Sequence, residues 1–167
     1  MLDWGKMLFD GMVFALIGSV IVLSAMAYNP RLFLNKGDFP PDILAAVPPK
    51  TREEQRLAIV AGIPFLLAII VAPLFSTWQF RHLAAGDVSL LVLALHAFGV
   101  IMVFNLFDLL VLDLLLFCTI TPRFMVVPGT EGLAGYKDKR FHLRAHLRSI
   151  PAMAAAALAV ALIASVL

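Results

Sequence analysis

Two carboxylates and one amide interrupt the longest apolar run of the chain. Asn105, Asp108 and Asp113 lie in FNLFDLLVLDLLLF, in which all other positions are apolar. An α-helix turns by about 100° per residue, so the three side chains would share an arc of about 140°. A mid-membrane aspartate costs roughly 2.5–3.5 kcal/mol on insertion scales, and such residues tend to mark sites. The three residues are therefore candidates for ligand binding.

The sequence leaves three interpretations of this polar face open. The groups could line a hydrated or ligand-filled cavity, or they could clamp neighbouring helices and pair with loop arginines. The third interpretation is exposure at the membrane interface, because residues 88–120 would form a helix of about 50 Å, longer than the hydrocarbon core of about 30 Å. In each case we expect the acids in the cytoplasmic half.

A basic segment near the end of the chain carries a second set of chemical groups. His142 and His146 are four residues apart, the spacing at which two imidazoles on one helical face can bind a metal ion. A divalent-ion site would also need Asp108 or Asp113 nearby. The alternative is a pair of surface histidines among cations.

Arg140, Arg144 and Arg148 repeat at the same four-residue interval, and Leu143 and Leu147 fall on a neighbouring face. This pattern predicts a short amphipathic helix at the membrane interface, before the last span. Its arginines are candidate ligands for anionic lipid headgroups. A general attraction of positive charge to the cytoplasmic face is the simpler explanation.

The composition indicates a membrane environment. Of 167 residues, 62% are hydrophobic and 14% are charged, far from the values typical of soluble domains. The lipid bilayer is thus the first expected partner, and no sequence pattern indicates binding to nucleic acid. The single cysteine, Cys118, excludes a disulfide within one chain.

Four apolar segments are long enough to cross a bilayer, at about residues 7–28, 58–80, 88–120 and 150–167. We therefore predict an all-α fold, a polytopic integral membrane protein whose four transmembrane helices form a bundle. Residues 1–167 would make a single membrane domain.

Lysine and arginine counts predict the orientation. Loops 29–57 and 121–149 carry five and six of these residues, whereas the opposite side has only Lys6 and Arg81. Because cytoplasmic loops are enriched in positive charge, we expect both loops in the cytoplasm and both termini outside the cell membrane.

Local patterns predict further contacts. Thr51 and Glu54 form a capping box, which indicates that the second helix starts before its apolar span. Lys6 and Asp10 are one turn apart and should form an ion pair. Gly11 and Ala15 form a small-residue pair that favours close helix packing.

Three classes of function fit these residues. The favoured class is a non-enzymatic membrane protein that binds a small ligand or lipid, or assists transport, through a polar pocket in the cytoplasmic half. The second is a membrane-embedded enzyme acting on a lipid headgroup, with Asp108 or Asp113 as base or metal ligand. The third is an assembly subunit, which would act as a homo-oligomer or with a partner membrane subunit. The sequence identifies no cofactor.

Overall fold

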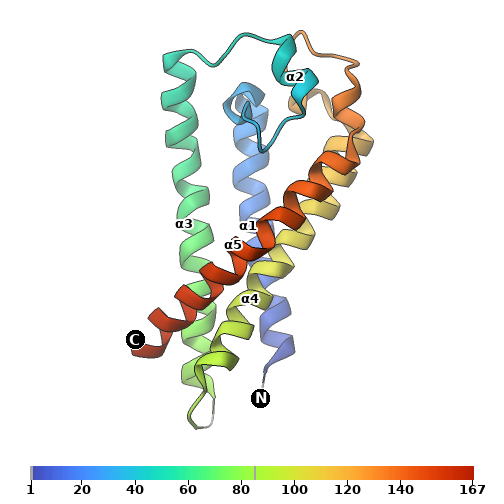
Figure 1. Cartoon of the computed structure of the whole chain (residues 1–167). Helices are drawn as coiled ribbons and strands as arrows, with labels where there is room; N and C mark the ends of the chain where they lie inside the picture. The colour runs from blue at the N-terminus through green and yellow to red at the C-terminus, as the bar shows by residue number, and fades with distance from the viewer. Residues whose placement is uncertain (1, 85) are drawn as a thin grey trace. The chain divides into compact units, whose positions relative to one another are not determined.

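The computed structural model describes residues 2–84 and 86–167 and is all-helical, with 81% helix. Figure 1 shows its long helices: α1 (Trp4–Tyr28), α3 (Arg52–Leu83), α4 (Leu90–Phe107), which continues as η2 (Asp108–Ile120), and α5 (Lys139–Val166). Counting α4 and η2 as one, these four helices are long and apolar enough to cross a membrane. The prediction of an all-α chain with four such helices is confirmed.

The chain folds into two compact units. Unit 1 consists of Met1–Gly18, Leu66–Phe107 and Arg148–Leu167, and unit 2 consists of Ser19–Phe65 and Asp108–Leu147. Each long helix contributes one part of its length to each unit.

Unit 1 is built by close packing of α1, α3, α4 and α5. A Cβ added to Gly11 would lie 2.6 Å from the Cβ of Val103, so only glycine fits there without a shift. Ala15 is fully buried, and the rings of Phe14 and Phe104 stack with centroids 4.4 Å apart. The predicted small-residue contact on α1 is therefore confirmed.

Unit 2 contains the two long connections, which fold on each other. The first forms η1 (Pro30–Phe33) and α2 (Pro41–Ala46); the second forms η3 (Arg123–Met125) and η4 (Ala134–Lys137). Figure 1 shows α2 beside the segment that precedes α5, and the backbone amide of Gly135 donates to Oδ2 of Asp42 over 2.8 Å. Their shared core consists of Met26, Leu34, Phe39, Ile43, Phe117, Cys118, Met125, Val127 and Tyr136.

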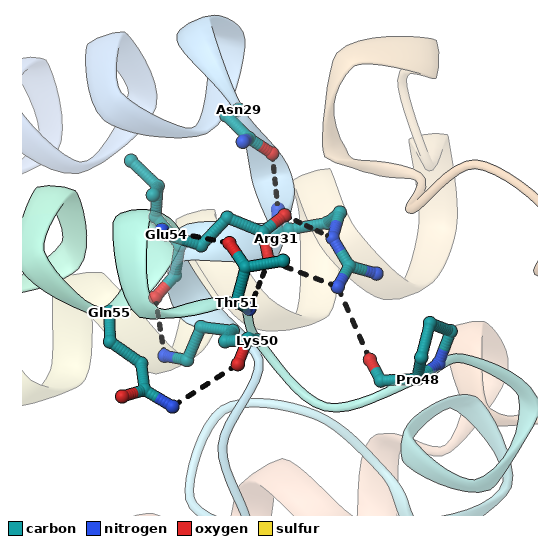
Figure 2. Close-up of polar contacts among 8 residues, drawn as sticks. Asn29, Arg31, Pro48, Lys50, Thr51, Glu54 and Gln55 are labelled. Atoms are coloured by element: carbon teal, nitrogen blue, oxygen red, sulfur yellow. Dashed lines mark hydrogen bonds and ion pairs between the residues drawn. The ribbon is translucent and has the colours of Figure 1, made fainter.

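The start of α3 is fixed by polar contacts, drawn in Figure 2. The amide of Thr51 donates to Glu54 over 2.7 Å, and the amide of Glu54 donates to the Thr51 hydroxyl over 3.1 Å, which confirms the capping box. Arg31 binds both carboxylate oxygens of Glu54, at 2.5 and 3.2 Å, and the Pro48 carbonyl at 3.2 Å. The hydrogen bond with Glu54 raises the pKa of Arg31 above its ordinary value. The first connection is thereby tied to α3.

The third span is not α-helical throughout. From Asp108 to Ile120 the backbone is a π-helix, in which each amide bonds to the carbonyl five residues earlier. The amide of Thr121 continues this pattern by donating to the Leu116 carbonyl over 2.7 Å. The prediction of an α-helix as far as residue 120 was wrong. Hydropathy identifies an apolar helix but does not distinguish an α-helix from a π-helix.

The predicted separate amphipathic helix before the last span is also wrong. Lys139–Val166 is one helix with Pro151 inside it, and Asp138 accepts bonds from the amides of Arg140 and Phe141 at its start, both 3.1 Å. Proline removes one backbone hydrogen bond, but the remaining bonds can carry the helix past it. The basic segment thus forms the first turns of α5.

Candidate functional site

Two histidines and two aspartates meet in unit 2. We call this group, Asp108, Asp113, His142 and His146, the carboxylate–histidine cluster. The aspartates come from η2 and the histidines from the first turns of α5. An i→i+5 hydrogen bond joins peptide groups five residues apart, so the π-helix brings Asp108 and Asp113 to the same side.

Asp113 is at the centre of the cluster. Its Oδ2 lies 3.0 Å from Nδ1 of His142 and 2.9 Å from Nε2 of His146. The Oδ2 of Asp108 lies 3.8 Å from the same Nε2 of His146. The acids and histidines that the sequence singled out are therefore brought together, with one carboxylate shared by both imidazoles.

The hydrogen-bond directions follow from the chemistry of these groups. An ionised carboxylate only accepts hydrogen bonds, so Nδ1 of His142 and Nε2 of His146 both carry hydrogens. In a neutral His142 ring the other nitrogen, Nε2, is then an acceptor. This atom is buried and has no hydrogen-bond partner in the part of the chain that the structure describes. It is the position in the cluster that can accept a hydrogen bond from a ligand.

Two aromatic rings, Phe117 and Phe141, contact His142. Its side chain is 3% exposed, and its ring meets Phe117 edge-on with centroids 4.9 Å apart. Burying a polar atom without a partner costs about 1–3 kcal/mol. Nε2 of His142 is therefore a costly feature of an otherwise apolar environment.

A divalent ion at His142 and His146 stays a prediction. Among the described residues, no group of three or more His, Cys, Asp or Glu side chains is arranged to hold an ion. The reason is that His142 and His146 both point directly at Oδ2 of Asp113, within hydrogen-bond distance. A bound ion would have to separate groups that here contact one another.

A pocket of about 520 Å³ in unit 2 adds a further carboxylate. Asn35, Asp38, Lys50 and Gln55 form its polar part. Its apolar walls are Ile21, Val22, Ala25, Leu32, Phe33, Ala58, Ile59, Ala61, Gly62 and Phe65. This volume is within the range of small-molecule sites.

Asp38 is the acidic group of this pocket, and its side chain remains exposed. Partial burial raises the pKa of Asp38 above its ordinary value, and the charge of Asp113 raises it further. A hydrogen bond from Asn35 and the charges of Lys50 and His142 act in the opposite direction. A molecule in the pocket would thus contact the exposed carboxyl group of Asp38, which accepts a hydrogen bond from Nδ2 of Asn35 over 2.5 Å.

The other predicted residues lie outside the cluster. Asn105 is 3% exposed on α4 and belongs to unit 1. Arg140 and Arg144 are exposed in unit 2, and Arg148 is exposed in unit 1. Binding of headgroups by these arginines stays a prediction.

Sequence reasoning missed two features. Asp38 lies in a loop 70 residues before Asp108, and no periodicity relates the two. In unit 1, Ser76 contacts both Asp10 and His96, although the sequence predicted only the Lys6–Asp10 pair, which is confirmed at 2.8 Å. The one available signal was a serine inside the apolar run of α3.

Comparison with known proteins does not assign a family. No family matches the chain, and no curated protein or solved structure is similar to it.

Proposed function

We propose that the four long helices cross the cell membrane, with both termini outside and residues 29–57 and 121–149 in the cytoplasm. The distribution of Lys and Arg supports this orientation, since eleven of the thirteen lie in those two segments. Apolar exposure supports membrane insertion: Ile59, Leu66 and Phe75 of α3 are 69%, 57% and 54% exposed. Lipid would cover this surface.

Within the membrane, the chain acts as a non-enzymatic protein that binds a small ligand or a lipid, or assists its transport. The observation that carries this proposal is the 520 Å³ pocket in unit 2, whose lining brings two charged side chains together with apolar walls. Its polar part has one cation, Lys50, and one carboxyl group, Asp38, and its walls are apolar. This chemistry fits an amphiphilic molecule with a polar head.

An enzyme acting on lipid headgroups has less support. It would need Asp108 or Asp113 as a base or metal ligand, but both imidazoles already donate to Oδ2 of Asp113. An assembly subunit would use the same apolar surface of α3 that lipid can cover.

The test is to identify the molecules that the purified protein retains. Mass spectrometry would compare lipids and small molecules bound to the unmodified chain and to the Asp38→Asn and Asp113→Asn variants. Asp87→Asn, which removes an exposed aspartate outside unit 2, is the matched control. We expect both test variants to retain about tenfold less of one molecule, the factor that corresponds to about 1.4 kcal/mol of binding free energy.

Two outcomes would contradict the proposal. Equal retention by all four proteins would show that Asp38 and Asp113 do not bind the retained molecule. Loss of a higher oligomer in Asp113→Asn, with retention unchanged, would favour the assembly subunit instead.

A further inference from the structure

A second pocket of unit 2 lies where η2 ends, and it shares no lining residue with the pocket of Asp38. Its volume is about 600 Å³, within the range of small-molecule sites. Its charged and hydroxyl side chains belong to Thr121, Arg123, Glu131, Tyr136 and Lys137. We call it the Arg123–Lys137 pocket, after its two cations.

The end of η2 holds Lys137 in place at this pocket. Nζ of Lys137 donates to the Thr121 hydroxyl over 2.6 Å and to the Thr119 carbonyl over 3.2 Å. An ammonium group has three hydrogens, so one of them remains for a ligand. Because the lysine is already oriented, a ligand would bind it at a lower cost in side-chain entropy.

Thr121 orients this lysine from an unfavourable backbone conformation. Its φ is 51°, and no other non-glycine residue has a positive φ in the part of the chain that the structure describes. This region is costly for a β-branched side chain, and such outliers cluster at ligand sites. The Thr121 hydroxyl donates to the Phe117 carbonyl over 2.8 Å, which leaves its oxygen to accept from Lys137.

Arg123 supplies the second cation of the pocket. Its side chain is exposed, and its guanidinium group forms no hydrogen bond or ion pair within residues 2–84 and 86–167. The planar fork of N–H donors in arginine matches the oxygen atoms of a phosphate group. All of its donors are therefore available to a ligand.

Glu131 is the acidic member of the lining. Both of its carboxylate oxygens accept from the backbone amide of Gly129, at 3.2 and 3.0 Å. Two cations against one carboxylate leave the lining with a net positive charge. The pocket therefore favours an anion, although Glu131 would weaken its binding.

The wall opposite in character to these charges is apolar and rigid. Tyr136 is 3% exposed, and its ring packs against Phe117 with centroids 5.3 Å apart. Its hydroxyl accepts from the amide of Val127 over 2.9 Å and lies 2.7 Å from the Thr130 hydroxyl. This wall is thus part of the core of unit 2 and does not have to form when a ligand binds.

Apolar side chains beside the pocket would bring it to the membrane surface. Ile120 and Phe124 flank the segment with Thr121 and Arg123, and they are 56% and 40% exposed. This step rests on the proposed membrane crossing, in which Ile120 is the last residue of the third span. The pocket would then open at the level of the lipid headgroups.

We propose that the Arg123–Lys137 pocket binds a phosphate group. Arg123 and Lys137 donate to the phosphate oxygens, and the wall with Tyr136 contacts the apolar part of the ligand. A phosphate group of this kind belongs either to an anionic lipid or to a soluble phosphate. None of the three arginines at the start of α5 lines this pocket, so the site is distinct from the headgroup ligands predicted there.

Isothermal titration calorimetry of the full chain in an uncharged detergent tests this site. One arm measures binding of phosphatidic acid in mixed micelles, and a second arm measures binding of inorganic phosphate. Diacylglycerol with the same acyl chains lacks the phosphate group and is the ligand control. Arg123→Gln and Lys137→Gln each remove one cation of the pocket. Lys139→Gln is the matched control, because Lys139 is exposed and does not line the pocket.

We expect phosphatidic acid to bind and diacylglycerol not to bind. The affinity for phosphatidic acid should fall by about tenfold in Arg123→Gln and in Lys137→Gln, because each loses a charge-assisted hydrogen bond to phosphate. In Lys139→Gln it should change by less than about twofold, as for an exposed charge that does not touch the ligand. Glu131→Gln should bind about two- to fivefold more tightly, since it removes a repelling carboxylate, and a misfolded chain would not show this gain.

The two arms distinguish the sources of the phosphate group. Binding of phosphatidic acid alone supports a lipid ligand, and binding of inorganic phosphate with the same losses supports a soluble one. No binding in either arm, an unchanged affinity in Arg123→Gln and Lys137→Gln, or an equal loss in Lys139→Gln would overturn the proposal. Because the pocket of Asp38 is tested by the molecules that the Asp38→Asn chain retains, failure at one pocket is distinguishable from failure at the other.

Discussion

His96 and His142 each pair one ring nitrogen and bury the other without a partner among the described residues. In each case the paired nitrogen donates, to Ser76 or to Asp113, and the remaining nitrogen is an acceptor. Both rings thus keep one acceptor that the described packing does not use.

The carboxyl group of Asp38 leads to a prediction of how stability depends on pH. Asp38 is exposed, but partial burial raises its pKa, so the folded chain holds this proton to a higher pH than the unfolded chain, whose ordinary value is about 3.9; solvent screening keeps the effect small. The stability gained from proton binding is present below that value and is lost as the pH rises through the folded pKa. Asp38→Asn should therefore be more stable than the unmodified chain at pH 7, and the difference should shrink toward pH 4.

Thermal unfolding in detergent at both pH values measures this difference. Asp87→Asn serves as the control for the change in net charge. An Asp38→Asn chain that is destabilised equally at both pH values would contradict the argument.

Among the elements, η2 determines the geometry of the cluster. Two carboxylates five residues apart meet the same His146 because the backbone is π-helical at that point. Long π-helices are rare, and π-helical turns occur frequently at functional sites. The π-helical backbone of η2 therefore positions Asp108 and Asp113 for their shared contact with His146.

The packing of α1 against α4 predicts how two glycine substitutions change stability. In Gly11→Ala the new Cβ would lie 2.6 Å from Cβ of Val103 and 3.1 Å from the Val100 carbonyl oxygen, and neither can move without shifting α4. We expect a loss of about 1–3 kcal/mol, the usual cost of overpacking. In Gly62→Ala nothing lies within 4 Å of the new Cβ, so helix propensity should stabilise the chain by up to about 1 kcal/mol.

Chemical denaturation of the two variants in the same detergent compares them directly. Similar shifts of the midpoint, in the same direction, would show that α1 and α4 do not pack closely in unit 1.

At the scale of the whole molecule, the sequence predicted what depends on local composition. Hydropathy located the four long helices, and short-range spacing predicted the pairs Lys6–Asp10 and Thr51–Glu54. The sequence did not predict contacts between distant segments. The contact of Ser76 with Asp10 is an example, because no pattern in one sequence relates residues 66 positions apart. The sequence also did not predict that α5 is continuous. A proline such as Pro151 can stand either in the first turn of a helix or at a bend within one.

The two units differ in charge, which leads to the last prediction. Ten of the thirteen lysines and arginines belong to unit 2. If positive charge marks the cytoplasmic side, Lys36 of the loop after α1 is inside the cell and Asp87 of the loop after α3 is outside. Both residues are exposed, and the natural Cys118 is 1% exposed, so Lys36→Cys and Asp87→Cys each add one accessible thiol.

In intact cells, a membrane-impermeant maleimide should label Asp87→Cys and leave both Lys36→Cys and the unmodified chain unlabelled. Permeabilised cells should allow labelling of Lys36→Cys as well. The reverse pattern would place the cluster and its pocket on the outer side, and labelling of both variants in intact cells would show that the loops after α1 and α3 lie on the same side. Because the positions of Lys36 and Asp87 are separated in the chain by the whole of α3, opposite accessibility would also establish that α3 crosses the membrane.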